Sequence, residues 1–327
     1  MLARERPSEV RVSRPAPSTA MLRDMALTVA LALQNAISRL ERVPASPRSD
    51  AEELLSRVLG TGRGDLRLLS SRELSAAEAE RFEGWLARRE AGEPVQYVTG
   101  RAAFRDLDLA VDRRVLVPRP ETEGLVEAVL EVLAAERSRW ESPRVLDLGT
   151  GSGAIALAIA QEAPHAQVSA VDASEDALAV ARANAFACAL VDRVTFSHGD
   201  WFGGVADDER FEVVVSNPPY IAESDAGSLP ADVRDWEPHA ALFSGPDGLD
   251  APREIVDTAP RHLVAGGLLA LELSESHAHE VAAWLEGAHD WRDVRVLDDL
   301  SGRPRVLLAR RERGPAIAPA QWGEERR

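Results

Sequence analysis

From residue 143 onward the sequence alternates between short apolar runs, rich in Val and Leu, and longer segments with helical spacing of apolar residues. This alternation predicts an α/β fold, in which a mostly parallel sheet carries helices on both of its faces. The predicted strands cover 144–148, 167–172, 193–200, 211–217, 267–273 and two late stretches. Ligands bind such sheets at the carboxyl ends of the strands. The residues that directly follow each strand are therefore the first candidates for a functional site.

A glycine-rich loop follows the first of these strands and leads directly into a predicted helix. Gly149, Gly151 and Gly153 allow the backbone to turn sharply and to approach a ligand closely. The start of the helix offers free N–H groups to an anion or a carboxylate. The candidate cofactor-binding residues of this loop are Gly149, Thr150, Gly151, Ser152 and Gly153.

Acidic and aromatic residues end the next two predicted strands. Asp172 ends the second strand, where a carboxylate can accept hydrogen bonds from both hydroxyl groups of a ribose. Asp200 can accept a hydrogen bond from an adenine amino group, and the Trp201 indole can pack on the face of the ring. The glycine loop can also be aligned with a dinucleotide fingerprint. Its Gly-x-Gly-x-Gly form, and the lack of an evident partner for hydride transfer, favour S-adenosyl-L-methionine.

The fourth predicted strand ends in Ser-Asn-Pro-Pro-Tyr, where two prolines remove two backbone donors and stiffen the chain. The Asn217 side-chain oxygen and the Pro218 carbonyl can each accept one hydrogen of a planar NH₂ group. Tyr220 can stack on that group, next to Pro219. We predict that this segment holds a substrate nitrogen for methyl transfer, with Asn217, Pro218 and Tyr220 as catalytic residues.

The composition excludes several classes of function. The sequence contains no lysine, so all 38 basic residues are arginine, which excludes pyridoxal-phosphate chemistry on a lysine and a Walker-A nucleotide site. The net charge is −16, and the arginine-rich ends carry +3, so residues 21–310 carry −19. Such an acidic body is poorly suited to a nucleic acid backbone, and we expect no direct nucleic acid partner.

The single cysteine, Cys188, excludes an internal disulfide and a cysteine-rich zinc site, and it suits a reducing compartment. The histidines show no metal-ligand spacing, so we expect no metal. No apolar run reaches the length of a membrane span, and residues 1–20 lack the apolar core of a secretory signal. The expected location is cytoplasmic, without a membrane partner.

Two folded domains are expected between two disordered ends, which are rich in Pro and Arg and lack periodicity. The predicted segments are a tail 1–20, a helical domain 21–94, a β-hairpin linker 95–118, an α/β domain 119–310 and a tail 311–327. Met21 and Met25 are alternative starts.

The predicted helices of the first domain carry start and stop signals. Ser49 and Ser75 each stand three positions before a glutamate, a spacing typical of a capping box. Gly60 and Gly92 follow as stops. These signals predict a small helical bundle, which serves either as a docking module for a partner or as a cap on the second domain.

Together the motifs resemble the class I, S-adenosylmethionine-dependent methyltransferases, and more closely the glutamine N5-methyltransferases of peptide chain release factors. The supporting stretches are PVQYVTG (94–100), VLVPRPETE (115–123), DLGTGSGAIALA (147–158), SNPPYI (216–221), WEPHAAL with GPDGLD (236–250) and DLSGRPRVLLAR (299–310). The chain departs from the family pattern at LELSESHAHE (271–280). Asn-Pro-Pro-Tyr alone is shared with DNA adenine and ribosomal RNA methyltransferases, whereas the Pro-Arg-Pro-Glu-Thr-Glu segment is more specific.

The resemblance implies a Rossmann-like methyltransferase domain, preceded by a helical domain that docks the release factor. It implies that the methyl acceptor is the glutamine of the factor's Gly-Gly-Gln loop, held by Asn217 to Tyr220, and that Arg119 lines the substrate approach with its two flanking prolines. The residues that it assigns to S-adenosyl-L-methionine are Gly149 to Gly153, Asp172, Trp201 and Asn217. Two alternatives stay open: an N6-adenine methyltransferase acting on DNA or RNA, and a glutamine methyltransferase acting on a ribosomal protein.

Overall fold

The computed structural model describes residues 27–43 and 46–312, and the chain divides into two compact units, Met1–Glu90 and Ala91–Arg327. The predicted tail 1–20 and the alternative starts lie outside the described residues. The predicted tail 311–327 begins too early, because Arg311 pairs with Trp291 and ends the last strand. The remainder of that tail, from 313, lies outside the described residues.

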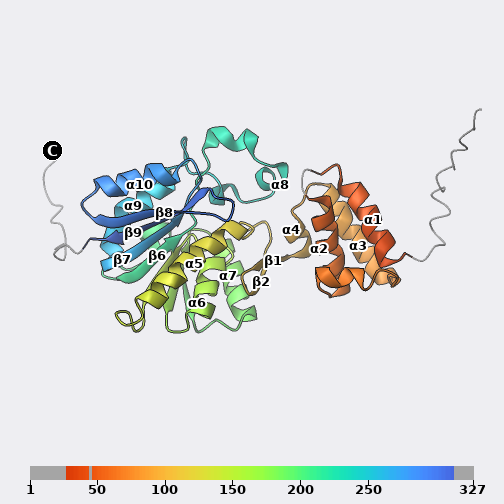
Figure 1. Cartoon of the computed structure of the whole chain (residues 1–327), viewed down its shortest axis with the longest axis horizontal. Coiled ribbons are helices and arrows are strands. Elements are labelled where there is room, and N and C mark those ends of the chain that lie inside the picture. The colour runs from red at the N-terminus through yellow and green to blue at the C-terminus, as the bar shows by residue number, and fades with distance from the viewer. Residues whose placement is uncertain (1–26, 44–45, 313–327) are drawn as a thin grey trace, which may run out of the picture. The chain divides into compact units, whose positions relative to one another are not determined.

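The described residues of the first unit form three α-helices and one 3₁₀ turn (Figure 1). They are α1 (Val29–Leu40), α2 (Pro47–Leu59), η2 (Arg63–Arg67) and α3 (Ala76–Glu90). Buried side chains recur along α1 at helical spacing, at Val29, Ala32, Ala36 and Leu40. Such an apolar stripe is buried when it packs on other helices. The helical secondary structure expected for this part of the chain is present.

The ends of these helices agree with most of the predicted signals. At the start of α3 the Ser75 backbone and hydroxyl donate to the Glu78 carboxylate, and the Glu78 N–H donates to the Ser75 hydroxyl, so this capping box is confirmed. The box at Ser49 is wrong, because α2 already begins at Pro47, whose fixed φ suits the first helical position. Gly60 ends α2 in the left-handed conformation, with φ of +63°.

The second unit begins with a short helix, α4 (Val95–Thr99), and a two-stranded hairpin, β1 (Arg101–Phe104) and β2 (Leu107–Ala110). The strand-like alternation expected from 95 onward is wrong for the first five residues, which are helical. Buried side chains of both hairpin strands belong to the main core of the second unit. The hairpin therefore packs as part of this unit.

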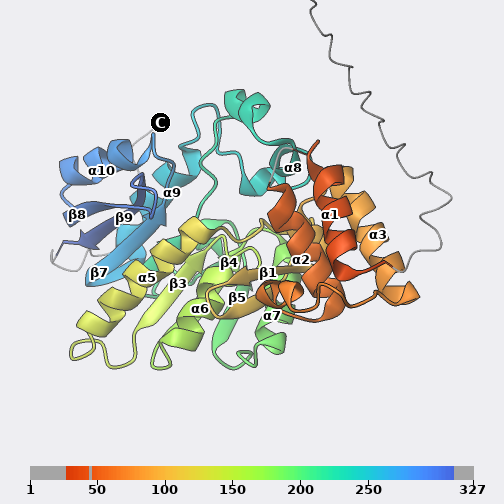
Figure 2. The same ribbon diagram turned by 45° about the vertical axis from the view of Figure 1, so that its right-hand side comes forward.

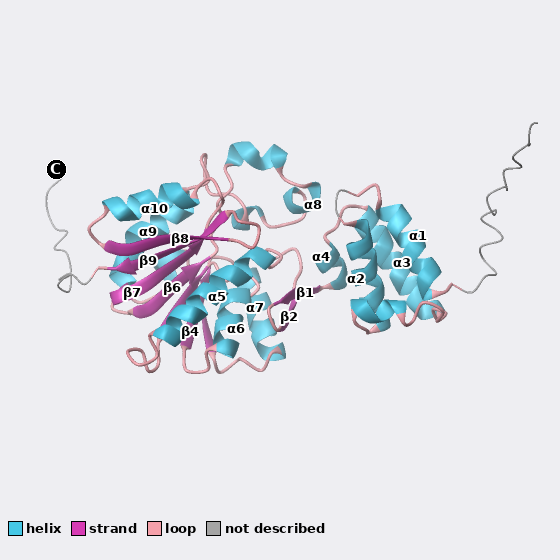
Figure 3. Ribbon diagram, viewed as in Figure 1, coloured by secondary structure: helices cyan, strands magenta, loops and turns pink. Residues whose placement is uncertain are grey.

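A seven-stranded sheet forms the centre of the second unit, with strand order β5-β4-β3-β6-β7-β9-β8 (Figure 3). The strands are β3 (Arg144–Leu148), β4 (Gln167–Asp172), β5 (Val194–His198), β6 (Phe211–Ser216), β7 (Leu263–Glu272), β8 (Trp291–Asp298) and β9 (Pro304–Arg311). The strands from β5 to β7 in this order pair in parallel, whereas β9 is antiparallel to both of its neighbours. The mostly parallel sheet is confirmed, and β3 and β4 have the predicted bounds.

Helices cover both faces of this sheet, as Figure 2 shows. One buried cluster joins the sheet to α5 (Pro120–Ala135), α6 (Ala154–Glu162) and α7 (Glu175–Ala187). The opposite cluster joins it to α9 (Asp250–His262) and α10 (Ala278–Gly287). Apolar side chains are therefore buried on both sides of the central strands, which explains their continuous Val and Leu runs.

Short helical segments lie in two of the connections that follow strands of the sheet. The turn η3 (Trp201–Gly204) follows β5, and the long connection from β6 to α9 contains η4 (Glu223–Ser228), α8 (Ala231–Arg234) and η5 (His239–Ala241). Within the described residues, no helix combines the length and apolar character that crossing a membrane requires.

A buried ion pair should stabilise the helical unit. The Arg89 Nε donates to Asp50 Oδ2 at 2.7 Å, and the Arg89 side chain is only 2% exposed. We expect Asp50→Ala to lower the free energy of unfolding of this unit by about 3 kcal/mol, because it leaves a buried charge without this partner.

Hydrogen exchange of the α1 to α3 amides would measure that loss. Arg48→Ala is the matched control, since Arg48 is 71% exposed and its pair with Glu52 should contribute less than about 0.5 kcal/mol. Equal exchange protection in the two variants would contradict the assignment.

Candidate active site

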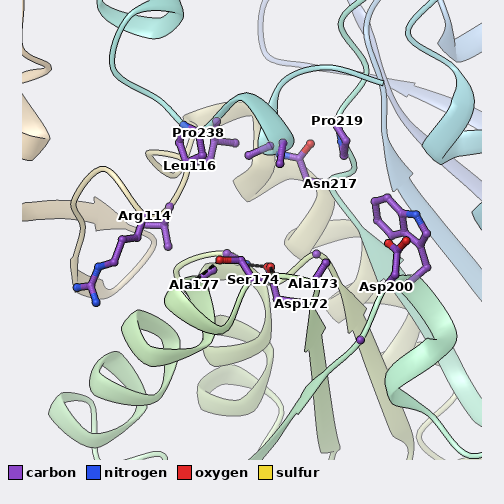
Figure 4. Close-up of a pocket in the computed structure, with 17 residues that line it drawn as sticks. Arg114, Leu116, Asp172, Ala173, Ser174, Ala177, Asp200, Asn217, Pro219 and Pro238 are labelled. Carbon is purple, nitrogen blue, oxygen red and sulfur yellow. Dashed lines mark hydrogen bonds between the residues drawn. The ribbon is translucent and has the colours of Figure 1, made fainter. Parts of the chain in front are cut away.

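A cavity of about 350 Å³ opens at the carboxyl ends of β3, β4 and β6. Its walls come from the glycine loop, the start of α7, the start of η3, the Asn-Pro-Pro-Tyr segment and two stretches at 114–116 and 238–241. Figure 4 shows Asp172 and Ser174 on one side of the cavity, with Leu116 and Asn217 on the other. The predicted strand-end residues are therefore brought together around one space.

The glycine loop curls back onto β4. The N–H groups of Gly149 and Thr150 both donate to the Val171 carbonyl, at 2.9 and 3.0 Å, and Gly149 and Gly151 have φ of +70° and +55°. Residues that carry a side chain rarely adopt this backbone conformation, which accounts for glycine at both positions. Gly149 and Gly151 line the cavity.

The other predicted loop residues do not face the main cavity. Thr150 and Ser152 are buried and line a smaller pocket of about 50 Å³, and Gly153 lines neither space. The Thr150 hydroxyl donates to Asp147 Oδ2 at 2.7 Å. Asp147 is fully buried, and burial raises the pKa of its carboxyl group to about 7. These residues therefore support the glycine loop without lining the main cavity.

Asp172 is held by the backbone on either side of it. Its Oδ2 accepts the Gly151 N–H at 2.8 Å, and its Oδ1 accepts the Ser174 N–H at 2.9 Å. Each carboxylate oxygen has a further lone pair, and Asp172 lines the cavity. The carboxylate is thus fixed in orientation while it remains able to accept from a ligand diol.

Asp200 and Trp201 line the cavity at the end of β5, as Figure 4 shows for Asp200. Trp201 has φ of +45°, which is an uncommon conformation for a bulky residue. A Cβ added at Gly149 would lie 3.6 Å from Trp201 Cζ3, so the indole approaches the glycine loop closely. Trp201 therefore brings an aromatic side chain to the cavity from a strained backbone position, and such positions concentrate at functional sites.

Asn217 lines both the cavity and the smaller pocket, so it stands where the two spaces meet. Its Nδ2 donates to the Thr122 hydroxyl at 3.1 Å, and its Oδ1 can accept a hydrogen bond. Pro219 lines the cavity, whereas Pro218 is buried. Tyr220 lines neither space, and its hydroxyl group lies 3.4 Å from Glu272 Oε1.

Arg119 lines the smaller pocket and directs its guanidinium to Glu237 Oε1, at 2.6 Å. The Glu237 side chain is 1% exposed, and its burial raises the pKa of the carboxyl group although Arg119 lowers it. This ion pair fastens the connection between β6 and α9 to the start of α5. Pro238 and the residues after it consequently reach the cavity wall.

Four residues whose side chains contact the site are not singled out by the sequence predictions: Thr122, Asn184, Glu237 and Glu272. Asn184 on α7 donates to the Ser152 and Ala110 carbonyls, at 2.9 and 3.0 Å, and so ties the glycine loop to the hairpin. Glu272 ends β7, so the strand-end argument applied to the fifth predicted strand could have found it. The others carry no local signal of their contacts.

Comparisons with known proteins agree with this geometry. Residues 32–100 match the family model described as PrmC N-terminal domain, and residues 126–229 match the Methyltransferase small domain. A release factor glutamine methyltransferase of Koribacter versatilis is 42% identical over 87% of this chain and 99% of its own length. One from Xylella fastidiosa is 44% identical over 85% of this chain and 96% of its own length.

The chain belongs to the release factor glutamine methyltransferase family. The solved structure of the hMettl16 catalytic domain has a TM-score of 0.50 at 14% identity, and covers 74% of this chain and 83% of that one. At that identity the likeness shows the class I methyltransferase fold alone. The fold class expected from the sequence is confirmed, as is the enzyme class.

S-adenosyl-L-methionine is the methyl donor of this family. The residues of the cavity fit its parts: Asp172 offers carboxylate oxygens for a ribose, and Trp201 offers an aromatic face for the adenine. Gly151 brings the backbone close to the same space. The ends of β3, β4 and β5 thus carry groups that fit the parts of this donor.

Asp172→Ala should weaken binding of S-adenosyl-L-methionine by about 100-fold, because it removes a charged acceptor for two hydroxyl groups. The Gly151 and Ser174 N–H groups would also lose their partner. Isothermal titration calorimetry of the full chain measures the change. Asp176→Ala, on the exposed first turn of α7, is the control, and an affinity of Asp172→Ala equal to that of the control would reject the ribose assignment.

Proposed function

We propose that this enzyme transfers a methyl group from S-adenosyl-L-methionine to the N5 side-chain nitrogen of the glutamine in the Gly-Gly-Gln motif of peptide chain release factors. The observation that carries the proposal is the orientation of Asn217. Its Nδ2 is bonded to Thr122, and its oxygen is left to accept a hydrogen bond where the cavity meets the smaller pocket. A primary amide requires such an acceptor for each of its hydrogens.

The reaction needs positioning more than a base. An amide nitrogen is a poor nucleophile because its lone pair is delocalised, and S-adenosyl-L-methionine supplies an electrophilic methyl group. Asn217 Oδ1 and the Pro218 carbonyl each accept one N–H of the glutamine, which orients the nitrogen and increases its electron density. Alignment of this kind can lower a barrier by about 7–11 kcal/mol. The nitrogen–methyl bond forms as the sulfur–methyl bond breaks, and the nitrogen then loses its proton to water.

Other residues have supporting roles in this proposal. The donor contacts Gly149, Gly151, Asp172 and Trp201, while Thr150, Ser152 and Gly153 form the loop behind them. Pro219 borders the glutamine side chain and Arg119 lines its approach, while Tyr220, which lines neither space, supports the segment through its contact with Glu272. The helical unit of α1 to α3 docks the release factor, and the enzyme acts in the cytoplasm, where a single free cysteine is compatible with the reducing conditions.

Transfer of labelled methyl groups tests the substrate. We expect label to enter a release factor and to be absent when the glutamine of its Gly-Gly-Gln motif is replaced by alanine. Ribosomal proteins and adenine-containing DNA or RNA should remain unlabelled. Label in any of these three in preference to the release factor would overturn the proposal.

Asn217→Ala should lower kcat by at least about 100-fold, because one preorganised acceptor of the transition state is lost. The KM for the release factor should change much less, because most of the factor's contacts lie elsewhere. Steady-state kinetics with the labelled donor measure both constants. A kcat within twofold of the unmodified enzyme would remove Asn217 from the substrate clamp.

A further inference from the structure

Leu300 stands in the turn that joins β8 to β9 and is fully exposed. Its exposed fraction is 110%, so no described residue shields the side chain. The other large apolar side chains exposed in the described part of the chain are Leu68, Phe186 and Val191. Exposed apolar residues are common one by one, so exposure alone does not indicate a function. Leu300 is distinguished by the turn that carries it and by its place in the fold.

The turn is held in one conformation by Asp299, whose side chain is 5% exposed. Asp299 Oδ1 accepts the N–H groups of Ser301 and Arg303, at 2.8 and 3.1 Å, and Oδ2 accepts Arg303 Nε at 3.0 Å. Two backbone hydrogen bonds close the turn, and Gly302 adopts a φ of +75°. A turn that is ordered before binding loses little conformational freedom when a partner covers it. Leu300 is therefore presented to the solvent by a preorganised support.

The sheet register places this turn at the same edge as the Asn-Pro-Pro-Tyr segment. Ser216, the last residue of β6, pairs with Leu271 of β7, and Leu271 pairs with Leu307 of β9. Because β9 is antiparallel, the residues before it lie past the carboxyl ends of the parallel strands. One strand separates β6 from β9, which corresponds to about 10 Å. The turn thus projects from the edge of the sheet that carries the site.

Side-chain contacts connect the turn with the surroundings of Asn217. Arg303 Nη2 lies 3.5 Å from Glu121 Oε1, on the first turn of α5. The next residue of α5, Thr122, accepts a hydrogen bond from Asn217 Nδ2 at 3.1 Å. A glutamine side chain is short, so a protein that brings its glutamine to Asn217 must place its backbone close to this edge. The turn borders the surface that such a protein covers.

We propose that Leu300 is a contact residue for the release factor, and that it enters an apolar hollow on the factor beside the loop that carries the methylated glutamine. The inference rests on the proposed function, since it takes the release factor as the substrate. Arg303 and Glu121, at 42% and 37% exposed, supply charged groups next to Leu300. An apolar centre with a polar rim is typical of specific interfaces between proteins. The contact adds affinity for the folded factor and is separate from the clamp on the amide.

Leu300→Ala removes most of the exposed apolar surface of the turn. We expect the KM for the release factor to rise about tenfold, because the burial of a leucine side chain on binding is lost. The kcat and the dissociation constant of S-adenosyl-L-methionine should stay within twofold, since Leu300 lines neither the cavity nor the smaller pocket. The melting temperature should not change. Leu300→Met keeps an apolar side chain of similar volume and should keep KM within about threefold.

Phe186→Ala is the matched control, because Phe186 is an apolar residue of the same unit that is 80% exposed. The helix α7 begins after the carboxyl end of β4 and returns toward the start of β5, so Phe186, near its end, lies at the opposite edge of the sheet. This variant should leave KM within twofold. A photoreactive p-benzoylphenylalanine placed at position 300 should form an adduct with the release factor on irradiation, and one placed at position 186 should not.

The outcomes separate this inference from the proposed function. If the unmodified enzyme labels no release factor, the proposed function fails, and the inference fails with it. If the factor is labelled while Leu300→Ala keeps the KM of the unmodified enzyme and position 300 forms no adduct, the contact alone is rejected. A lower kcat or weaker donor binding in Leu300→Ala, with KM unchanged, would show that the turn supports the site instead, which also overturns the contact. Because KM reports affinity only where chemistry is slower than release, the adduct decides where the two readouts disagree.

Discussion

The parallel pairing of β3 with β4 on one side and with β6 on the other is the constraint on which the rest of the site depends. From β3 the chain winds outward to β4 and β5, and then returns to lay β6 against the opposite edge of β3. Crossover helices diverge at such a point and leave a crevice at the carboxyl ends of the strands. The loops after β3, β4 and β6 therefore face one cavity. They deliver backbone N–H groups, a carboxylate and an amide oxygen to the same space.

A feature of the site could be predicted from the sequence only where residues close together in the chain determine it. The positions of Asp172 and Asn217 follow from short apolar runs and from the rule that ligands bind at strand ends. The partners that orient Asn217 do not, because Thr122 lies 95 positions before it in the chain. The capping box at Ser49 failed for a local reason instead, since Pro47 provides an earlier and better helix start.

The absence of lysine restricts which groups can move a proton in this enzyme. Every side-chain cation except histidine is a guanidinium, which stays charged at neutral pH and forms planar, paired contacts with carboxylates. Arg105, for example, bonds Glu127 and both oxygens of Glu162. A methyl transfer that relies on fixed acceptors suits such a composition, because it requires neither a neutral amine nor a titrating base.

Three buried carboxyl groups near the site each lower the stability of the folded protein. Asp147, Glu237 and Glu272 are each at most 4% exposed, and among the described residues they hold the buried carboxyl oxygens that lack a hydrogen-bond partner. Burial raises the pKa of all three. Asp147 accepts from Thr150 and Glu237 accepts from Arg119, both of which border the smaller pocket, while Glu272 accepts from the Tyr220 hydroxyl group. Each of these carboxyl groups thus supports a neighbouring side chain behind the site. The free energy lost by burying these groups is offset by the large apolar core on both faces of the sheet.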